Sequence, residues 1–66
     1  MRRVLRRIGT DHFLKPTGED TDHYDNGKTF SGFTEALDFC VERDLKGVEL
    51  VLLDEFGQEQ ACITLM

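Results

Sequence analysis

The sequence predicts an α+β fold, a small two-layer ββαββ domain in which one helix packs on a mainly antiparallel sheet. Three segments lead to this prediction. Residues 2–14 carry strand and turn signals, residues 30–47 have helical periodicity, and residues 48–66 contain two further strand-like runs. A length of 66 residues allows one domain, residues 1–66, with a thin core.

The first segment is expected to form a β-hairpin. RRVLRRI, residues 2–8, fits a short amphipathic helix as well as a strand, and we favour the strand. Gly9 comes first in the two-residue connection of IGTD, as a type II′ turn requires. This turn would place Leu5 across from Leu14.

A polar loop of about a dozen residues, 17–28, is expected after Pro16 ends the second strand. The acids in GEDTDHYDNG (18–27) suggest a calcium site, but the spacing of known calcium loops is not met. After D-x-D the third acid comes one residue late, and Phe33 stands where a glutamate ligand is needed. We interpret the loop as solvated, with three acids that can steer a basic partner: Asp20, Asp22 and Asp25.

The middle segment, residues 30–47, predicts an amphipathic surface helix. Its apolar residues recur at helical spacing: Phe33, Ala36, Leu37, Cys40 and Val41. Ser31 is the preferred N-cap, with Thr34 as the alternative. Gly47 is expected to end the helix through a positive φ, with Val48 closing the apolar contact that accompanies such a cap.

The last segment predicts a second hairpin, in which VELVLLD (48–54) and QEQACITLM (58–66) are joined by a turn. Asp54 and Gly57 stand at the first and fourth positions of a type I turn, and Gly57 can also supply a bulge. The register stays open. One alternative places Leu50 opposite Cys62, and the other pairs Leu50 with Ala61 and gathers apolar residues on one face.

The run 48–54 is apolar on both sides, and one helix covers only one face of a sheet. Val51 and Leu53 therefore need a cover on the second face. A loop or a second subunit can provide it, which makes homodimerisation a hypothesis.

Charge divides sharply along the chain. The net charge is −5, yet the first eight residues hold four arginines and no carboxylate. The acidic remainder disfavours a general nucleic-acid binder and favours basic protein partners. On a strand, the arginines project to both faces and suit a solvated edge strand, a local phosphate contact or pairing with the chain's own acids: Arg2, Arg3, Arg6 and Arg7.

No cofactor, metal or catalytic set is predicted. Four residues match a Cys₂His₂ zinc set by count, but without close pairs in the sequence: His12, His23, Cys40 and Cys62. Both cysteines are expected to be small buried thiols, which argues against a nucleophilic Cys40. The sequence also lacks a phosphate-binding glycine loop and a G-x-S-x-G motif.

Two aromatic residues are candidate partner-binding residues. Phe39 lies on the flank of the predicted apolar helix face, where it is either exposed or covered by the long loop. Phe56 stands at the predicted hairpin tip, which turn chemistry places at the surface. Both would suit the anchor positions of a protein interface.

Residues 27–37, GKTFSGFTEAL, resemble the stretch of HicB-type antitoxins and several small phage inhibitors in which a strand ends and a helix opens. The Pro-rich strand ending and the DNA-binding segment of those antitoxins are not found in the 66 residues. No site residue is carried over. The resemblance implies only that small acidic proteins of this kind often occupy a surface on a larger partner.

The sequence therefore favours a non-enzymatic, acidic protein-interaction module, an adaptor or inhibitor that docks on a larger basic protein. The alternative function is a nucleic-acid-binding domain that uses the N-terminal arginines. No signal peptide and no membrane span are recognised, so a cytoplasmic location is expected.

Overall fold

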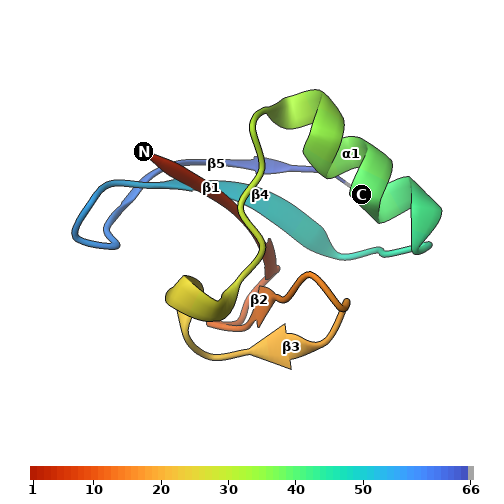
Figure 1. Ribbon diagram of the computed structural model, residues 1–66, viewed down its shortest axis with the longest axis horizontal. Coiled ribbons are helices and arrows are strands. Elements are labelled where there is room, and N and C mark those ends of the chain that lie inside the picture. Colours follow the sequence, from red (N-terminus) through yellow and green to blue (C-terminus); the bar gives the residue numbers. More distant parts are fainter. Residues whose placement is uncertain (66) are drawn as a thin grey trace.

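A five-stranded sheet with a helix across one face forms the fold (Figure 1). The computed structural model describes residues 1–65. Its elements are β1 (Arg2–Arg7), β2 (Phe13–Leu14), β3 (Asp20–Thr21), the 3₁₀ helix η1 (Tyr24–Asn26), α1 (Phe33–Glu42), β4 (Val48–Leu53) and β5 (Glu59–Thr64). All neighbouring strands are antiparallel, in the order β3-β2-β1-β4-β5. The predicted α+β class is confirmed, but an additional strand precedes the helix.

The arginine-rich strand β1 lies at the centre of the sheet. Each of its six residues pairs with β4, from Arg2 opposite Leu53 to Arg7 opposite Val48. Val4 and Leu5 point to opposite faces, and both are fully buried. The prediction of a strand is confirmed, but the interpretation as a solvated edge strand is wrong. Val4 and Leu5 place β1 in the core, although four of its six residues are arginines.

The first hairpin has the expected partners but a different turn. Arg6 pairs with Phe13, and Leu5 and Leu14 share one buried cluster. The Thr10 N–H donates to the Arg7 carbonyl (3.1 Å), which places Gly9, with φ 79°, third in the turn rather than second. The type II′ prediction is therefore wrong, because the chain leaves β1 one residue earlier than expected.

The segment predicted as a loop, residues 17–28, contains β3 and η1. Asp20 of β3 pairs with Leu14 of β2, and the Lys28 N–H donates to the Leu14 carbonyl (2.8 Å). Backbone hydrogen bonds thus tie both ends of this segment to β2. The short strand was not predicted because two polar residues give no alternation of hydrophobicity.

Helix α1 begins after Gly32, and Ser31 does not cap its backbone. The Ser31 hydroxyl donates instead to Glu35 Oε2 (2.7 Å), which lowers the pKa of Glu35. The helix ends at Glu42, well before Gly47. Its end is a Schellman motif, in which the Leu45 N–H donates to the Cys40 carbonyl (2.9 Å) and Asp44 takes the left-handed conformation with φ 52°. Asp44 thus has the role predicted for Gly47, although Gly47 also has a positive φ of 68°.

Asp44→Gly is expected to raise the free energy of unfolding by about 0.5 to 1 kcal/mol. Glycine adopts the left-handed conformation without strain, and the change removes a negative charge from the negative end of the helix dipole. Urea denaturation provides the measurement. Asp44→Ala is the control, because it removes the same charge but keeps the Cβ atom. A gain as large in Asp44→Ala would assign the effect to charge alone.

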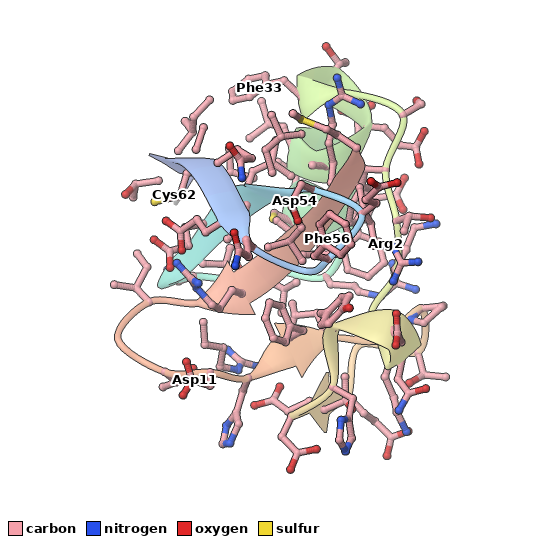
Figure 2. The ribbon with its side chains drawn as sticks, turned by 90° about the vertical axis from the view of Figure 1, so that its left-hand side faces the viewer. Arg2, Asp11, Phe33, Asp54, Phe56 and Cys62 are labelled. Atoms are coloured by element: carbon pink, nitrogen blue, oxygen red, sulfur yellow. The ribbon has the colours of Figure 1, made fainter. Side chains whose placement is uncertain are left out.

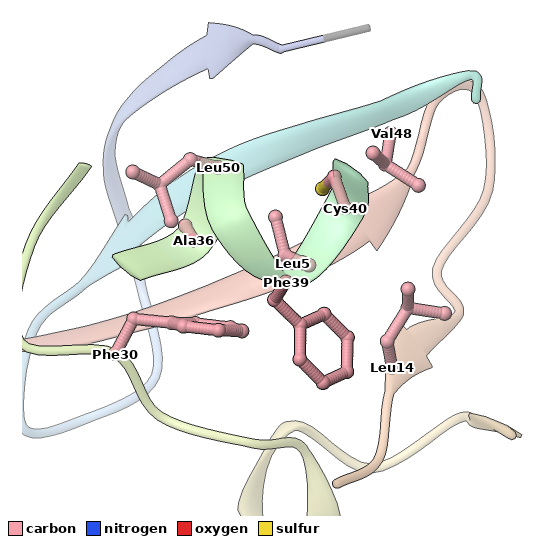
Figure 3. Close-up of a cluster of buried hydrophobic side chains, with 8 residues drawn as sticks. All are labelled: Leu5, Leu14, Phe30, Ala36, Phe39, Cys40, Val48 and Leu50. Atoms are coloured by element: carbon pink, nitrogen blue, oxygen red, sulfur yellow. The ribbon is translucent and has the colours of Figure 1, made fainter. Parts of the chain in front are cut away.

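The buried face of α1 is rotated relative to the prediction (Figure 3). Ala36, Phe39 and Cys40 face the sheet, whereas Phe33 and Val41 are exposed. Phe39 is only 6% exposed, so of the two alternatives for this residue the exposed one, on which its role as a partner-binding residue depended, is wrong. It belongs to the main core cluster, which consists of Leu5, Leu14, Phe30, Ala36, Phe39, Cys40, Val48 and Leu50.

The second hairpin has the predicted turn and a register that was not anticipated. The Gly57 N–H donates to the Asp54 carbonyl (3.1 Å), and Gly57 has a φ of 80°. Leu50 pairs with Ile63, so both predicted registers are wrong. An irregularity between Leu52 and Leu53 leaves Gln60 as an extra residue in β5. Leu50, Leu52, Ala61 and Ile63 share one face of the sheet, whereas Val51 and Leu53 lie on the other face.

The second face of the sheet is covered from within the chain. Val4, Val51 and Leu53 form a small buried cluster, against which Phe13 and Tyr24 pack. Tyr24 belongs to η1, so the segment 17–28 covers this face. Of the two alternatives, a loop or a second subunit, the loop is the one that the structure contains. This face does not require a second subunit.

Candidate functional site

Within residues 1–65, three of the four N-terminal arginines form ion pairs. Arg2 Nη1 lies 2.7 Å from Asp25, and Arg7 Nε lies 3.0 Å from Asp20. Arg6 contacts Glu49 (2.8 Å) through Nε and Glu59 (2.9 Å) through Nη1. The arginines therefore do not form one free basic patch. Of the three interpretations proposed for the arginines, pairing with the chain's own acids applies to Arg2, Arg6 and Arg7.

The Arg6–Glu49 pair is the most buried of these contacts, with side chains 17% and 10% exposed. The Cys62 thiol donates to the other oxygen of Glu49 (3.3 Å). Burial alone would raise the pKa of Glu49, but the hydrogen bonds from Arg6 and Cys62 and the charge of Arg6 hold this pKa below its ordinary value. The hydrogen bond to Glu49, with some burial, raises the pKa of Cys62. Cys62 is exposed, which corrects its prediction as a buried residue, and its raised pKa disfavours a reactive thiolate.

Glu49→Gln is expected to lower the free energy of unfolding by about 2 to 3 kcal/mol at pH 7, because Arg6 loses its most buried counter-charge. The pKa of Glu49 is lower in the folded state, so its stabilisation is complete above the unfolded value of about 4.3 and is lost as pH falls through the folded value. The difference between Glu49→Gln and wild type should therefore shrink below about pH 4. Urea denaturation between pH 3 and 7 measures it.

The more exposed Glu59, which also contacts Arg6, supplies the control for this prediction. Glu59→Gln should change the free energy of unfolding by less than about 1 kcal/mol, because solvent screens an exposed pair. Equal losses in the two variants, or a Glu49→Gln loss that does not depend on pH, would contradict the role given to the Arg6–Glu49 pair.

The tip of the β4–β5 hairpin packs against η1. A Cβ atom added to Gly57 would lie 2.5 Å from Cζ of Tyr24, so the glycine backbone rests directly on the tyrosine ring. The Arg2 guanidinium lies 5.5 Å from the centroid of the same ring, within cation–π range. Tyr24 thus joins three segments that are distant in the sequence: β1, η1 and the hairpin tip.

These segments surround a depression of about 250 Å³, lined by Met1, Arg2, Tyr24, Asp25, Asp54 and Glu55. Phe56 follows Glu55 and is 77% exposed. We call these six lining residues together with Phe56 the tip surface. Figure 2 shows Arg2, Asp54 and Phe56 grouped in this part of the molecule. The tip surface combines exposed apolar side chains with three carboxylates.

Asp54 holds the turn that presents Phe56. Its Oδ1 accepts hydrogen bonds from the Phe56 and Gln58 N–H groups, both at 2.9 Å, and its Oδ2 accepts one from the Gln60 amide (3.0 Å). The backbone at Phe56 is therefore fixed although its side chain is exposed. A fixed, exposed aromatic residue loses little entropy on binding, which suits it to anchor a protein interface.

The structure brings together only some of the predicted site residues. Arg2 and Asp25 line the same depression, next to the hairpin tip that carries Phe56, whereas Arg7 and Asp20 pair near the β1–β2 connection. Asp22 is exposed, with His23 as its neighbour at 3.5 Å. Met1, Tyr24 and Glu55 were not predicted as site residues. The one sequence signal for the contact between the hairpin tip and Tyr24 was Gly57, which we interpreted as a turn residue alone.

A second surface feature, which we call the edge groove, lies between the start of α1 and the last two strands. It has a volume of about 160 Å³, and its lining is almost entirely apolar: Arg3, Phe33, Leu50, Leu52, Ala61 and Ile63. Phe33 is 48% exposed and Ile63 is 53% exposed. The predicted partner-binding residue Arg3 therefore lies apart from the other predicted residues.

Within residues 1–65, no group of three or more His, Cys, Asp or Glu side chains is arranged to hold a metal ion. Nor does any helix in this part of the chain combine the length and apolar character needed to cross a lipid bilayer. No protein-family model, no curated protein and no solved structure matches the chain. The resemblance of residues 27–37 to HicB-type antitoxins therefore rests on those eleven residues alone.

Proposed function

We propose that this protein is a non-enzymatic interaction module that docks on a basic surface of a larger protein through its tip surface. The observation that carries the proposal is the exposed Phe56 beside a depression with three carboxylates. Two exposed apolar side chains, Phe56 and Met1, supply contact area. Asp25, Asp54 and Glu55 supply negative charge around them.

The charge balance of the folded chain supports a basic partner. The β1 arginines are largely neutralised by four carboxylates within the chain, while the net charge is −5. A lysine or arginine of the partner can enter the depression next to Glu55, for which the described residues show no ion pair. Long-range attraction of this kind accelerates association and weakens with salt.

The alternative, a nucleic-acid-binding domain, receives less support. Phosphate binding requires a free cluster of cations, and Arg2, Arg6 and Arg7 each contact a carboxylate within 3.0 Å. The proposal also places the module in the cytoplasm, where Cys40 and Cys62 remain thiols.

Affinity capture with the immobilised protein, followed by titration of the captured partner, tests the proposal. Phe56→Ala is expected to weaken partner binding at least about tenfold, as the loss of an interface anchor does, and to leave stability nearly unchanged. Ile8→Ala is the control, because Ile8 is also an exposed apolar residue but lies in the β1–β2 connection. It should bind like wild type.

The dependence of binding on salt and the binding of nucleic acid provide results that would contradict the proposal. Binding of the partner should weaken as salt is raised from about 50 to 500 mM, because the Debye length shortens. Binding that does not respond to salt, or that is the same in the Phe56→Ala and Ile8→Ala variants, would reject the tip surface. A gel shift with DNA or RNA that disappears when the four arginines are replaced by alanine would favour the alternative function.

A further inference from the structure

Beyond the bulge at Gln60, the outer edge of β5 lacks the features that usually protect an edge strand. In the described part of the chain, residues 1–65, β5 has a sheet neighbour on one side only, β4. All six of its residues are exposed. Natural edge strands are protected by lysine, proline or inward-pointing charge, yet residues 60–64 (QACIT) contain none of these. In a chain in which 32% of the residues are charged, this uncharged run on an open edge calls for a physical explanation.

The hydrogen-bond pattern shows which backbone groups face outward. The Leu65 N–H donates to the Val48 carbonyl (3.1 Å), and Leu50 pairs with Ile63. In an antiparallel ladder the bonded residues alternate, so Ala61, Ile63 and Leu65 bond to β4. The N–H and C=O groups of Cys62 and Thr64 therefore point away from the sheet. They form a pairing edge for one more strand.

The edge groove lies beside this pairing edge. Ala61 and Ile63 belong both to β5 and to the groove, and Phe33 stands at its other side. A strand added to β5 would continue the apolar rows of Leu52–Ala61 and Leu50–Ile63 across the sheet. It would satisfy the outward backbone groups and cover the exposed part of Ile63 in one step.

We propose that the strand that occupies this edge is β5 of a second copy of this chain. The two β5 strands run antiparallel about a two-fold axis at Cys62, the centre of the uncharged run 60–64. Ala61 and Cys62 then lie opposite Ile63 and Cys62 of the second copy. Each small Ala61 meets a large Ile63, and the two edge grooves join into one apolar strip.

Charge and symmetry select a second copy as the occupant. Two chains that each carry a net charge of −5 repel each other, and this repulsion is smallest where the facing surfaces carry no charged side chains. Residues 60–64 provide such a surface, and a basic partner would gain no electrostatic attraction from it. A two-fold axis also requires a self-complementary surface, which an antiparallel strand pair supplies.

This arrangement leaves both tip surfaces free. Because the two β5 strands run in opposite directions, the β4–β5 turns point toward opposite ends of the dimer. The dimer would present two copies of Phe56 to partners, although its existence does not depend on the proposed function. The two interactions also respond oppositely to salt, since screening weakens attraction to a basic partner and strengthens association of like-charged copies.

The experiment measures the dimer directly with the full chain. Sedimentation equilibrium should give a dimer whose dissociation constant falls as salt is raised. Oxidation with copper(II) phenanthroline should link the chains through Cys62, because the paired Cα atoms are about 5.5 Å apart, within disulfide range. Cys62→Ser should lose the covalent link and keep the dimer, whereas Cys62→Pro should lose the dimer, since proline removes the outward N–H at the axis.

A second pair of variants keeps the test valid if the proline variant does not fold. Ile63→Lys should raise the dissociation constant at least about tenfold. Val41→Lys places the same charge on another exposed apolar position, outside β5, and should leave the dissociation constant unchanged. A monomer at millimolar concentration and high salt would overturn the proposal. So would a dimer that Ile63→Lys and Cys62→Pro, shown to be folded by circular dichroism, leave intact.

Discussion

Phe39→Ala is expected to lower the free energy of unfolding by about 3 to 4 kcal/mol, the usual loss for a buried phenylalanine. The Phe39 ring packs edge-on against Phe30, with 5.4 Å between the ring centroids. The Arg43 guanidinium lies 4.1 Å from its centroid on the solvent side. Truncation would leave a cavity under the helix that Ala36 and Cys40 cannot fill. Because a chain of this size has a total stability of only several kcal/mol, the variant should be close to unfolded at 37 °C.

Phe33→Ala is the matched control, since it makes the same change on the same helix at a residue that is 48% exposed. Its loss should stay near 1 kcal/mol, in proportion to the smaller apolar area removed from the core. Both variants can be compared by urea denaturation at 25 °C. If Phe33→Ala were the more destabilising change, the helix would have the orientation that its periodicity predicted, and Phe39 would be a surface residue.

Gly57→Ala is expected to lower the free energy of unfolding by about 3 kcal/mol through two additive causes. Gly57 has a φ of 80°, which disfavours any residue with a Cβ atom. The added Cβ atom would also lie 2.5 Å from Tyr24 Cζ, so the hairpin tip or the ring must move. Thermal unfolding should show a fall in Tm well above 10 °C.

Two comparisons separate these causes. Gly9 has a nearly identical φ of 79° but no atom within 4 Å of an added Cβ, so Gly9→Ala should lower stability by only about 1 kcal/mol. In a Tyr24→Ala background, the loss of stability caused by Gly57→Ala should also fall to about 1 kcal/mol, because the clash is absent. A Gly57→Ala loss that is the same with and without Tyr24 would show that the tip does not rest on the ring.

The elements of this fold were predictable from local patterns, but the orientation of the helix was not. Phe33, Leu37 and Val41 repeat every four residues, and so do Phe39 and Arg43 on the opposite flank. Periodicity alone cannot decide which flank faces the sheet. The sheet decides it, because Phe30 and Leu14 stand where Phe39 can reach them. Phe33 instead lines a groove whose other wall is the exposed strand β5.

The candidate site was less predictable, because its residues meet only through the sheet order. Arg2 reaches Asp25, and Arg6 reaches Glu49, only when β1 lies at the centre of the sheet. The arginine content of β1 suggested an edge instead. Tyr24 gave no signal at all in a polar segment, although its ring supports the tip. Phe56 was predictable because its exposure follows from turn chemistry within four residues.

The central position of β1 has a consequence for how this protein folds. Residues 2–7 find most of their sheet partners in residues 48–53, so the middle of the sheet closes only after residues 48–53 have been synthesised. Closure of such a long loop before any central contact forms is characteristic of slow-folding topologies. On the ribosome, Val4 and Leu5 would emerge before β4 and would stay unpaired until β4 is available. The four arginines around them would keep this nascent segment in solution until β4 arrives.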